Sequence, residues 1–64
     1  MKNRLKELRE CRGMSQEELA EKSGVSRTTI SELETEKKEV TTNITLERIA
    51  KALGERVSNI FFIS

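Results

Sequence analysis

Hydrophobic positions in this chain recur at spacings of three and four residues, which is the repeat of an α-helix that buries one face. The clearest run places apolar residues at i, i+3, i+4 and i+7, namely Leu46, Ile49, Ala50 and Leu53. Gly54 follows this run and predicts its end. Thr42 or Asn43 precedes it as the expected N-cap, because a short polar side chain can accept a hydrogen bond from a free backbone N–H. One amphipathic helix is predicted between these signals.

Capping residues delimit the other predicted helices. Ser15 precedes a second helix and Glu18 follows it by three residues, which is the spacing of a reciprocal capping box. Gly24 ends that helix, where a left-handed backbone suits glycine best, and Ser26 caps a third helix. The expected inward positions are Leu5 and Leu8 in a first helix ending at Gly13, Leu19 and Ala20 in the second, Val25, Ile30 and Leu33 in the third, and Val57, Ile60 and Phe61 in a short fifth.

Alternation of apolar and polar residues, the pattern of a half-buried strand, is nearly absent. The candidate extended stretches are residues 61–63 and 40–42, and the longest irregular stretch, residues 35–43, has no Gly or Pro to indicate a turn type. Five helical segments with no repeat and no linker predict a compact all-α fold of five helices in a single domain over residues 1–64. A short extended tail at the C-terminus is compatible with the same pattern.

Length and composition limit what this domain can be. A chain of 64 residues, of which 34% are hydrophobic and 36% charged, allows one domain with a small core. A partner subunit is therefore expected to supplement its stability. No stretch approaches the roughly 20 apolar residues of a membrane span, and no apolar segment opens the chain as a signal peptide would. We expect a cytoplasmic protein with no membrane partner.

Few of the residue types that perform chemistry are present. The sequence has no His and no Asp, and its single cysteine, Cys11, excludes an internal disulfide and a multi-cysteine zinc site. Without His, Cys11 lacks the base that usually activates a catalytic thiol, so we expect it to be a semi-buried filler on the first helix. There is no Gly-rich phosphate loop. The sequence thus predicts a protein that is not an enzyme, with no metal, no cofactor and no small-molecule ligand.

The net charge of +1 does not by itself indicate a nucleic-acid partner. The charge is uneven along the chain, because residues 1–12 carry a net +3, residues 13–25 a net −2, and residues 26–38 sum to zero. An anionic partner would therefore meet selected patches of the surface. Its sequence-independent attraction would be weak, and binding would depend on a matched site and on dimerisation.

The second and third helices have the spacing of a helix-turn-helix, with about seven residues, a three-residue turn containing Gly24, and about nine residues. Further segments match a known family in order and register: RLKELR (4–9), GMSQEELA (13–20), GVSR (24–27), IS (30–31), LE (33–34), IAKALG (49–54) and IF (60–61). Through these segments nearly the whole chain resembles the phage-repressor and Cro-like helix-turn-helix proteins, the xenobiotic-response-element (XRE) family. The resemblance implies a lambda-repressor-like DNA-binding domain.

The resemblance also implies that the third helix, residues 26–34, enters the DNA major groove with its N-terminal residues on base edges. Arg27 can then donate two hydrogen bonds to guanine, and Thr28 can meet a thymine methyl group. Ser31 and Glu32 are further base-contacting candidates, Glu32 as an acceptor from cytosine or as a group that excludes other sequences. The alternatives are that Arg27 and Thr28 are merely solvated and that Glu32 pairs with a nearby cation.

Phosphate contacts are expected to set the docking on DNA. Gln16 begins the second helix, where free N–H groups and the helix dipole favour a phosphate, and the matching Gln of the family reaches the DNA backbone. Ser26 and Thr29 are further candidates, although Ser26 is also a helix cap. Lys37 and Lys38 follow the third helix and can reach phosphates. For Gln16 and the two lysines, the alternative is a solvated side chain without a DNA contact.

Arg9 and Glu34 match family positions that form an ion pair between the first helix and the end of the third. Such a pair would fix the angle of the reading helix, even if its net effect on stability is near zero. The chain departs from the family after the third helix, where Thr35-Glu36-Lys37 replaces Asn-Gly-Lys. Without this Gly the helix is expected to end differently, and Glu36 places negative charge where DNA would approach.

A dimer is expected because one small reading helix makes few contacts. A two-fold symmetric dimer makes twice as many contacts, on a pseudo-palindromic site whose half-sites lie about one turn of DNA apart. The C-terminal residues 60–64 hold more apolar groups than so small a bundle buries, so the predicted dimer interface comprises Phe61, Phe62 and Ile63. Within it, Phe61 completes the core while Phe62 and Ile63 meet the second subunit, for example by strand addition. A tail folded onto its own subunit is the alternative.

These observations predict a sequence-specific DNA-binding transcriptional regulator, most simply a phage- or plasmid-type repressor that binds double-stranded DNA as a homodimer. The sequence contains no ligand-sensing or protease-sensing domain, so we expect control by protein concentration or by a partner. The alternative from another class is an antitoxin that masks a toxin through its tail and binds DNA secondarily. That alternative predicts co-purification with a partner protein.

Overall fold

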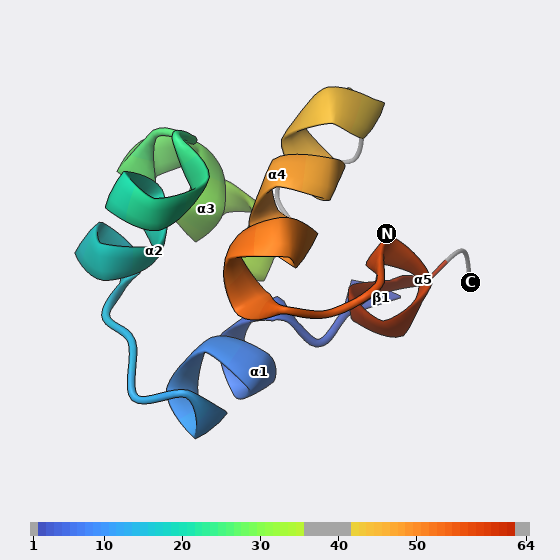
Figure 1. Ribbon diagram of the computed structural model, residues 1–64, viewed down its shortest axis with the longest axis horizontal. Coiled ribbons are helices and arrows are strands. Elements are labelled where there is room, and N and C mark those ends of the chain that lie inside the picture. Colours follow the sequence, from blue (N-terminus) through green and yellow to red (C-terminus); the bar gives the residue numbers. More distant parts are fainter. Residues whose placement is uncertain (1, 36–41, 63–64) are drawn as a thin grey trace.

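A computed structural model of the chain describes residues 2–35 and 42–62. Five helices and two short strands make up the described part (Figure 1). They are β1 (Lys2–Asn3), α1 (Leu5–Cys11), α2 (Gln16–Ser23), α3 (Arg27–Glu34), α4 (Asn43–Leu53), α5 (Val57–Ile60) and β2 (Phe61–Phe62). This arrangement confirms the predicted all-α fold of five helices, to which the structure adds a minimal sheet.

The capping geometry confirms the predicted start and end of α2 and the predicted starts of α3 and α4, whereas α1 ends at Cys11, two residues before the predicted Gly13. Ser15 Oγ accepts a hydrogen bond of 3.0 Å from the Glu18 N–H, and the Glu18 carboxylate accepts one of 3.3 Å from the Ser15 N–H. Ser26 and Thr42 each accept a bond of 3.2 Å from the N–H three residues on, at the starts of α3 and α4. Gly24 ends α2 at φ 74°, in the left-handed region. Local sequence signals therefore define the turn between α2 and α3.

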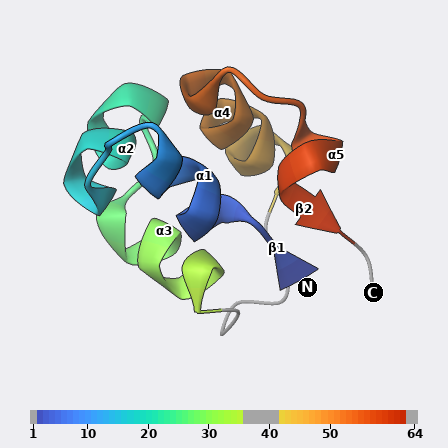
Figure 2. The ribbon, with the colours of Figure 1, turned by 90° about the horizontal axis from the view of Figure 1, so that it is seen from below.

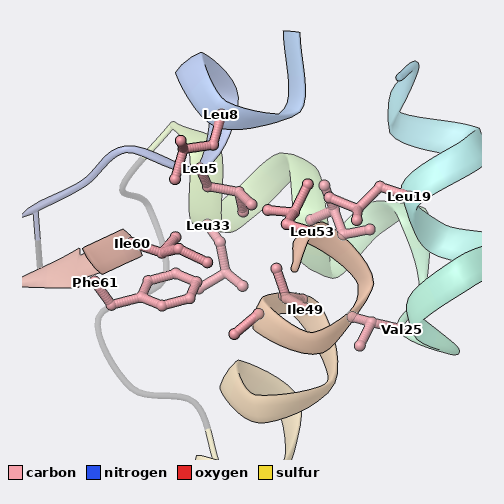
Figure 3. Close-up of a cluster of buried hydrophobic side chains, with 11 residues drawn as sticks. Leu5, Leu8, Leu19, Val25, Leu33, Ile49, Leu53, Ile60 and Phe61 are labelled. Atoms are coloured by element: carbon pink, nitrogen blue, oxygen red, sulfur yellow. The ribbon is translucent and has the colours of Figure 1, made fainter. Parts of the chain in front are cut away.

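A single hydrophobic cluster holds the helices together (Figure 3). Its buried side chains come from every helix and from β2, and they are Leu5, Leu8, Leu19, Val25, Ile30, Leu33, Ile49, Ala50, Leu53, Ile60 and Phe61. Ala20, Leu46 and Val57, also predicted to face inward, are partly buried against this cluster. Burying one Leu or Ile side chain contributes about 1.5–3 kcal/mol. The helical repeat of the sequence thus predicted the core.

The extended C-terminal tail pairs with the N-terminus of its own chain. β1 and β2 are antiparallel, with Asn3 opposite Phe61, and the two strands lie side by side in Figure 2. The Arg4 N–H extends the pairing with a bond of 2.7 Å to the Ile60 carbonyl. The extended backbone of Phe61 and Phe62 agrees with the short extended tail expected from the sequence. Its partner β1 was not predicted, because two residues carry no readable pattern.

The expectation that Cys11 is a semi-buried filler is wrong, since Cys11 is exposed at the end of α1. The buried side of α1 is formed by Leu5, Leu8 and Arg9. Because an α-helix has 3.6 residues per turn, Arg9 lies on nearly the same side of α1 as Leu5, whereas Cys11 lies on a different side. The charged residue Arg9 thus occupies the inner face of α1 on which the cysteine was expected.

Several predictions fall outside the described residues. They concern Glu36, Lys37, Lys38 and Ile63, and the candidate extended stretch at residues 40–42 apart from Thr42. Within residues 2–35 and 42–62, no helix is long and apolar enough to cross a membrane. The longest, α4, has 11 residues, whereas a span needs about 20.

Candidate nucleic-acid interface

The helix pair α2–α3 presents one polar face to solvent. α2 packs against both α3 and α4, and the two helices of the pair are joined by the three residues 24–26. Ile30 and Leu33 of α3 are fully buried and hold its inner side against the core. By the helical repeat, the side chains of Ser31 and Glu32, between these two positions, are therefore turned away from the core.

Five of the predicted DNA-contacting residues line one open hollow on this face. They are Gln16 from the first turn of α2 and Arg27, Thr28, Ser31 and Glu32 from α3. Arg27 and Thr28 are exposed, whereas Gln16, Ser31 and Glu32 are half-buried. The hollow combines a cation, an anion, an amide and two hydroxyls. Such a surface offers donors and acceptors together, as base-edge recognition requires.

The Arg27 guanidinium is free to meet a partner. Its side chain is 65% exposed, and Nη1 lies 4.0 Å from an oxygen of Glu17, whose side chain is 77% exposed. An ion pair of this length between two exposed side chains contributes about 0–1 kcal/mol, so a ligand can displace it at little cost. Among the described residues, no other acidic side chain forms an ion pair with Arg27.

Ser26 and Thr29 differ in what they can still donate. Ser26 Oγ accepts from the Thr29 N–H at 3.2 Å and donates its own proton to Thr29 Oγ1 at 2.8 Å. The Ser26 hydroxyl is therefore engaged as a cap in both directions. The Thr29 hydroxyl receives that bond and keeps its own O–H for another acceptor, so of the two residues Thr29 is better placed to donate to a phosphate.

Arg9 and Glu34, the residues expected to pair, join α1 to the last residue of α3. Arg9 Nε lies 2.7 Å from Glu34 Oε2 and Nη2 lies 3.2 Å from Oε1, which is a two-point contact. The side chains are 10% and 3% exposed. The pKa of Arg9 is raised above its usual value, mainly by the hydrogen bond with Glu34 and less by the negative charge of Glu34. A buried pair of this geometry resists any rotation of α3 relative to α1.

The C-terminus of α3 is held by side chains instead of a glycine. Thr35 Oγ1 lies within hydrogen-bond distance of the carbonyl oxygens of Ser31 (3.0 Å) and Glu32 (3.2 Å). Asn3 Nδ2 donates to the Leu33 carbonyl at 2.8 Å. These contacts add side-chain partners to carbonyl oxygens of the last turn of α3, where the regular helical hydrogen bonds run out. The helix ends without the left-handed residue of the family pattern, at Thr35 with φ −90°.

Sequence reasoning missed Asn3, which lies 30 residues from its partner Leu33. Its Oδ1 also accepts from the Leu5 N–H at 3.0 Å, so one side chain serves both the start of α1 and the end of α3. The only local signal was an Asn two residues before an apolar helix start.

The residues predicted to form a dimer interface differ in exposure. Phe61 is 7% exposed and belongs to the core, where its ring lies beside Ile60 (Figure 3), so it has little surface left for a second subunit. Phe62 is 38% exposed. Ile44, at the start of α4, is 62% exposed and is the other large apolar side chain of this kind within the described ranges. No group of acidic or Cys side chains in those ranges is arranged to hold a metal ion.

Comparisons with known proteins agree with this geometry. A family model described as helix-turn-helix matches residues 5–60, from the first residue of α1 to the last residue of α5. The chain is also 41% identical over 61 residues to a protein of Methanocaldococcus jannaschii named as an uncharacterized HTH-type transcriptional regulator. That match covers 95% of this chain and 91% of the Methanocaldococcus protein.

Proposed function

The chain belongs to the XRE-type helix-turn-helix family of DNA-binding transcriptional regulators, which are not enzymes. We propose that it is a phage- or plasmid-type repressor that acts as a homodimer on a pseudo-palindromic operator. In this proposal α3 lies in the major groove of double-stranded DNA, and the protein works in the cytoplasm at the nucleoid of a bacterium or its phage. The observation that carries it is the hollow in which Gln16 of α2 meets Arg27, Thr28, Ser31 and Glu32 of α3.

Base reading is assigned to the α3 side of this hollow. Arg27 and Thr28 occupy the first turn of α3, the part of a recognition helix that reaches deepest into the groove. Arg27 would donate to guanine O6 and N7, and Thr28 would contact a thymine methyl group. Ser31 and Glu32 lie one turn further along and would read the neighbouring bases, with Glu32 accepting from cytosine N4.

Phosphate contacts are assigned to the rim. Gln16 and Thr29 would donate to phosphates with the groups that their internal hydrogen bonds leave free, and Ser26 supports Thr29 through the bond between their hydroxyls. Lys37 and Lys38, which lie outside the described residues, are proposed as further phosphate ligands. Because cations and anions cancel over residues 26–38, affinity would come from these matched contacts more than from net charge.

Dimerisation is assigned to the C-terminal tail. Phe62 projects from β2 with 38% of its surface exposed, and it would pack with Ile63 against the same segment of a second subunit. Phe61 would support the contact from within the core. A symmetric contact of this kind would place two copies of α3 on half-sites about one helical turn apart.

Selection of bound duplexes from a random pool tests the proposal. We expect an enriched sequence with two-fold symmetry, and loss of preference at one position of each half-site for Arg27→Ala. A charge-matched control is Lys6→Ala, which removes an exposed cation of α1 and should leave the preferred sequence unchanged. Failure to enrich any sequence would exclude a sequence-specific repressor, and an enriched site without symmetry would exclude the homodimer.

A further inference from the structure

The buried carboxylate of Glu34 has a third partner besides the two contacts with Arg9. Gln16 Nε2 donates to Glu34 Oε1 at 3.2 Å, and the same oxygen lies 3.2 Å from Arg9 Nη2. Arg9 also donates through Nη1 to the Met14 carbonyl at 2.6 Å. A chain of hydrogen bonds thus leads from the residues just before α2, through the Arg9–Glu34 pair, to the first side chain of α2. That side chain also lines the hollow.

This contact determines how the Gln16 amide is oriented. An ionised carboxylate only accepts hydrogen bonds, so the NH2 group of Gln16 must face Glu34. Its carbonyl oxygen and its second N–H then remain for another partner. A free Gln side chain loses rotamer entropy when it is immobilised. In this chain part of that loss is incurred on folding, before any DNA is bound.

The charge of Glu34 is compatible with a phosphate close by. Its side chain is 3% exposed, and Arg9 contacts both of its oxygens. The Arg9 guanidinium therefore neutralises the carboxylate that anchors the amide. The first-turn N–H groups of α2 add a favourable field for an anion at the same end.

We propose that Glu34 is a positioning residue for DNA binding, which holds the Gln16 amide so that its second N–H donates to a phosphate oxygen. This role rests on the proposed function and adds to it a residue that touches no DNA. It is separate from the contact between Glu34 and Arg9, which sets the angle of α3. The two roles predict different operator affinities when Gln16 is replaced by Ala.

The experiment requires a variant that removes Glu34 without leaving Arg9 buried and unpaired. Arg9→Met combined with Glu34→Met does so, because exchanging a whole buried ion pair for apolar residues of similar size is often neutral or stabilising. Operator affinity is measured for the wild type, for Gln16→Ala, for the double variant and for the triple variant. Circular dichroism at the temperature of the assay gives the folded fraction of each.

In the wild-type background, we expect the double replacement to weaken operator binding roughly three- to tenfold, the cost of immobilising one flexible side chain on binding. In the Gln16→Ala background the same replacement should cost less affinity than in the wild type, because only the effect on the angle of α3 is left and Gln16 is no longer there to position. An equal loss in both backgrounds would overturn this role and leave only the effect on the angle of α3. If the wild type binds no duplex, the proposed function and this role fall together.

Gln16 is the only glutamine in the sequence, so in a ¹⁵N NMR spectrum its side-chain NH2 signals need only be distinguished from those of Asn3, Asn43 and Asn59. In the DNA-free protein we expect this NH2 group to be more ordered than in the Arg9→Met/Glu34→Met variant. The exposed Asn43 at the start of α4 should be equally mobile in both and serves as the control. Equal mobility of Gln16 in the two proteins would overturn the anchoring role whatever the binding data show.

Discussion

Asn3 Nδ2 donates a hydrogen bond of 2.8 Å to the carbonyl oxygen of Leu33. This bond attaches β1 to the C-terminal turn of α3. Because Asn3 also pairs with Phe61 across the small sheet, the last turn of the proposed reading helix is linked to the tail that carries the proposed dimer contact. The orientation of α3 therefore depends on both chain ends as well as on the Arg9–Glu34 pair.

Asn3→Ala is expected to destabilise the fold by about 1–3 kcal/mol, since two part-buried hydrogen bonds are lost at about 0.5–1.5 kcal/mol each. For a domain of this size the melting temperature falls by roughly 4–8 °C per kcal/mol. Thermal unfolding followed by circular dichroism measures the change. Asn43→Ala, at an exposed position of α4, is the matched control and should shift the melting temperature far less. Equal shifts for the two variants would contradict the role of Asn3.

Acid should weaken the contact between α1 and the α4–α5 turn. Glu55 accepts from Asn59 Nδ2 at 3.2 Å and from Arg12 Nη2 at 2.9 Å, and these hydrogen bonds, that of Asn59 first, lower the pKa of Glu55. A carboxyl whose pKa is lower in the folded state adds stability above its unfolded pKa. That stability is lost as pH falls through the folded value. Glu55→Gln removes this dependence.

We therefore expect Glu55→Gln to lose less stability than the wild type between pH 7 and about pH 3, a value below the unfolded pKa of Glu. Urea midpoints at the two pH values measure the difference. Glu21→Gln on the exposed side of α2 is the control, since Glu21 forms no ion pair within the described ranges, and it should follow the wild type. A Glu55→Gln curve as steep as that of the wild type would show that the contact has no such effect.

Arg27→Ala should relax discrimination at one base position per half-site by about 1–3 kcal/mol, the contribution of a two-point contact with guanine. Arg27→Lys should relax it nearly as much, because an ammonium lacks the planar pair of donors. Lys37→Ala is the comparison, expected to weaken all duplexes alike and to reduce the salt dependence by about one phosphate contact. Competition binding at several salt concentrations separates the two patterns. A uniform loss with Arg27→Ala would assign Arg27 to the DNA backbone.

Phe62→Ser should convert a dimer into a monomer at micromolar concentration, because it replaces an exposed aromatic group of β2 with a hydroxyl. Sedimentation equilibrium measures the mass of both proteins. Ile44→Ser is the matched control, since it removes an exposed apolar group at the start of α4 and should leave the mass unchanged. A mass unaffected by Phe62→Ser, or lowered by Ile44→Ser alone, would place any interface away from the tail.

Much of the candidate site could be predicted from the sequence. Once Ile30 and Leu33 face the core, the helical repeat turns Arg27, Thr28 and Ser31 outward. The bond from Gln16 to Glu34 could not be predicted in the same way. It joins atoms 18 residues apart in the chain, and nothing near either residue specifies the other. The DNA contacts of these residues and the dimer stay predictions.

The sequence by itself determined both ends of α2 and the start of α3, because Ser15, Ser26 and Gly24 act on backbone groups within a few residues of themselves. It also determined the buried face of each amphipathic helix, since that follows from a repeat of 3.6 residues. Only the tertiary structure decided that Cys11 is exposed and that Asn3 closes α3. Those outcomes depend on which helix packs beside which, and that arrangement is the result of burying all the apolar faces at once.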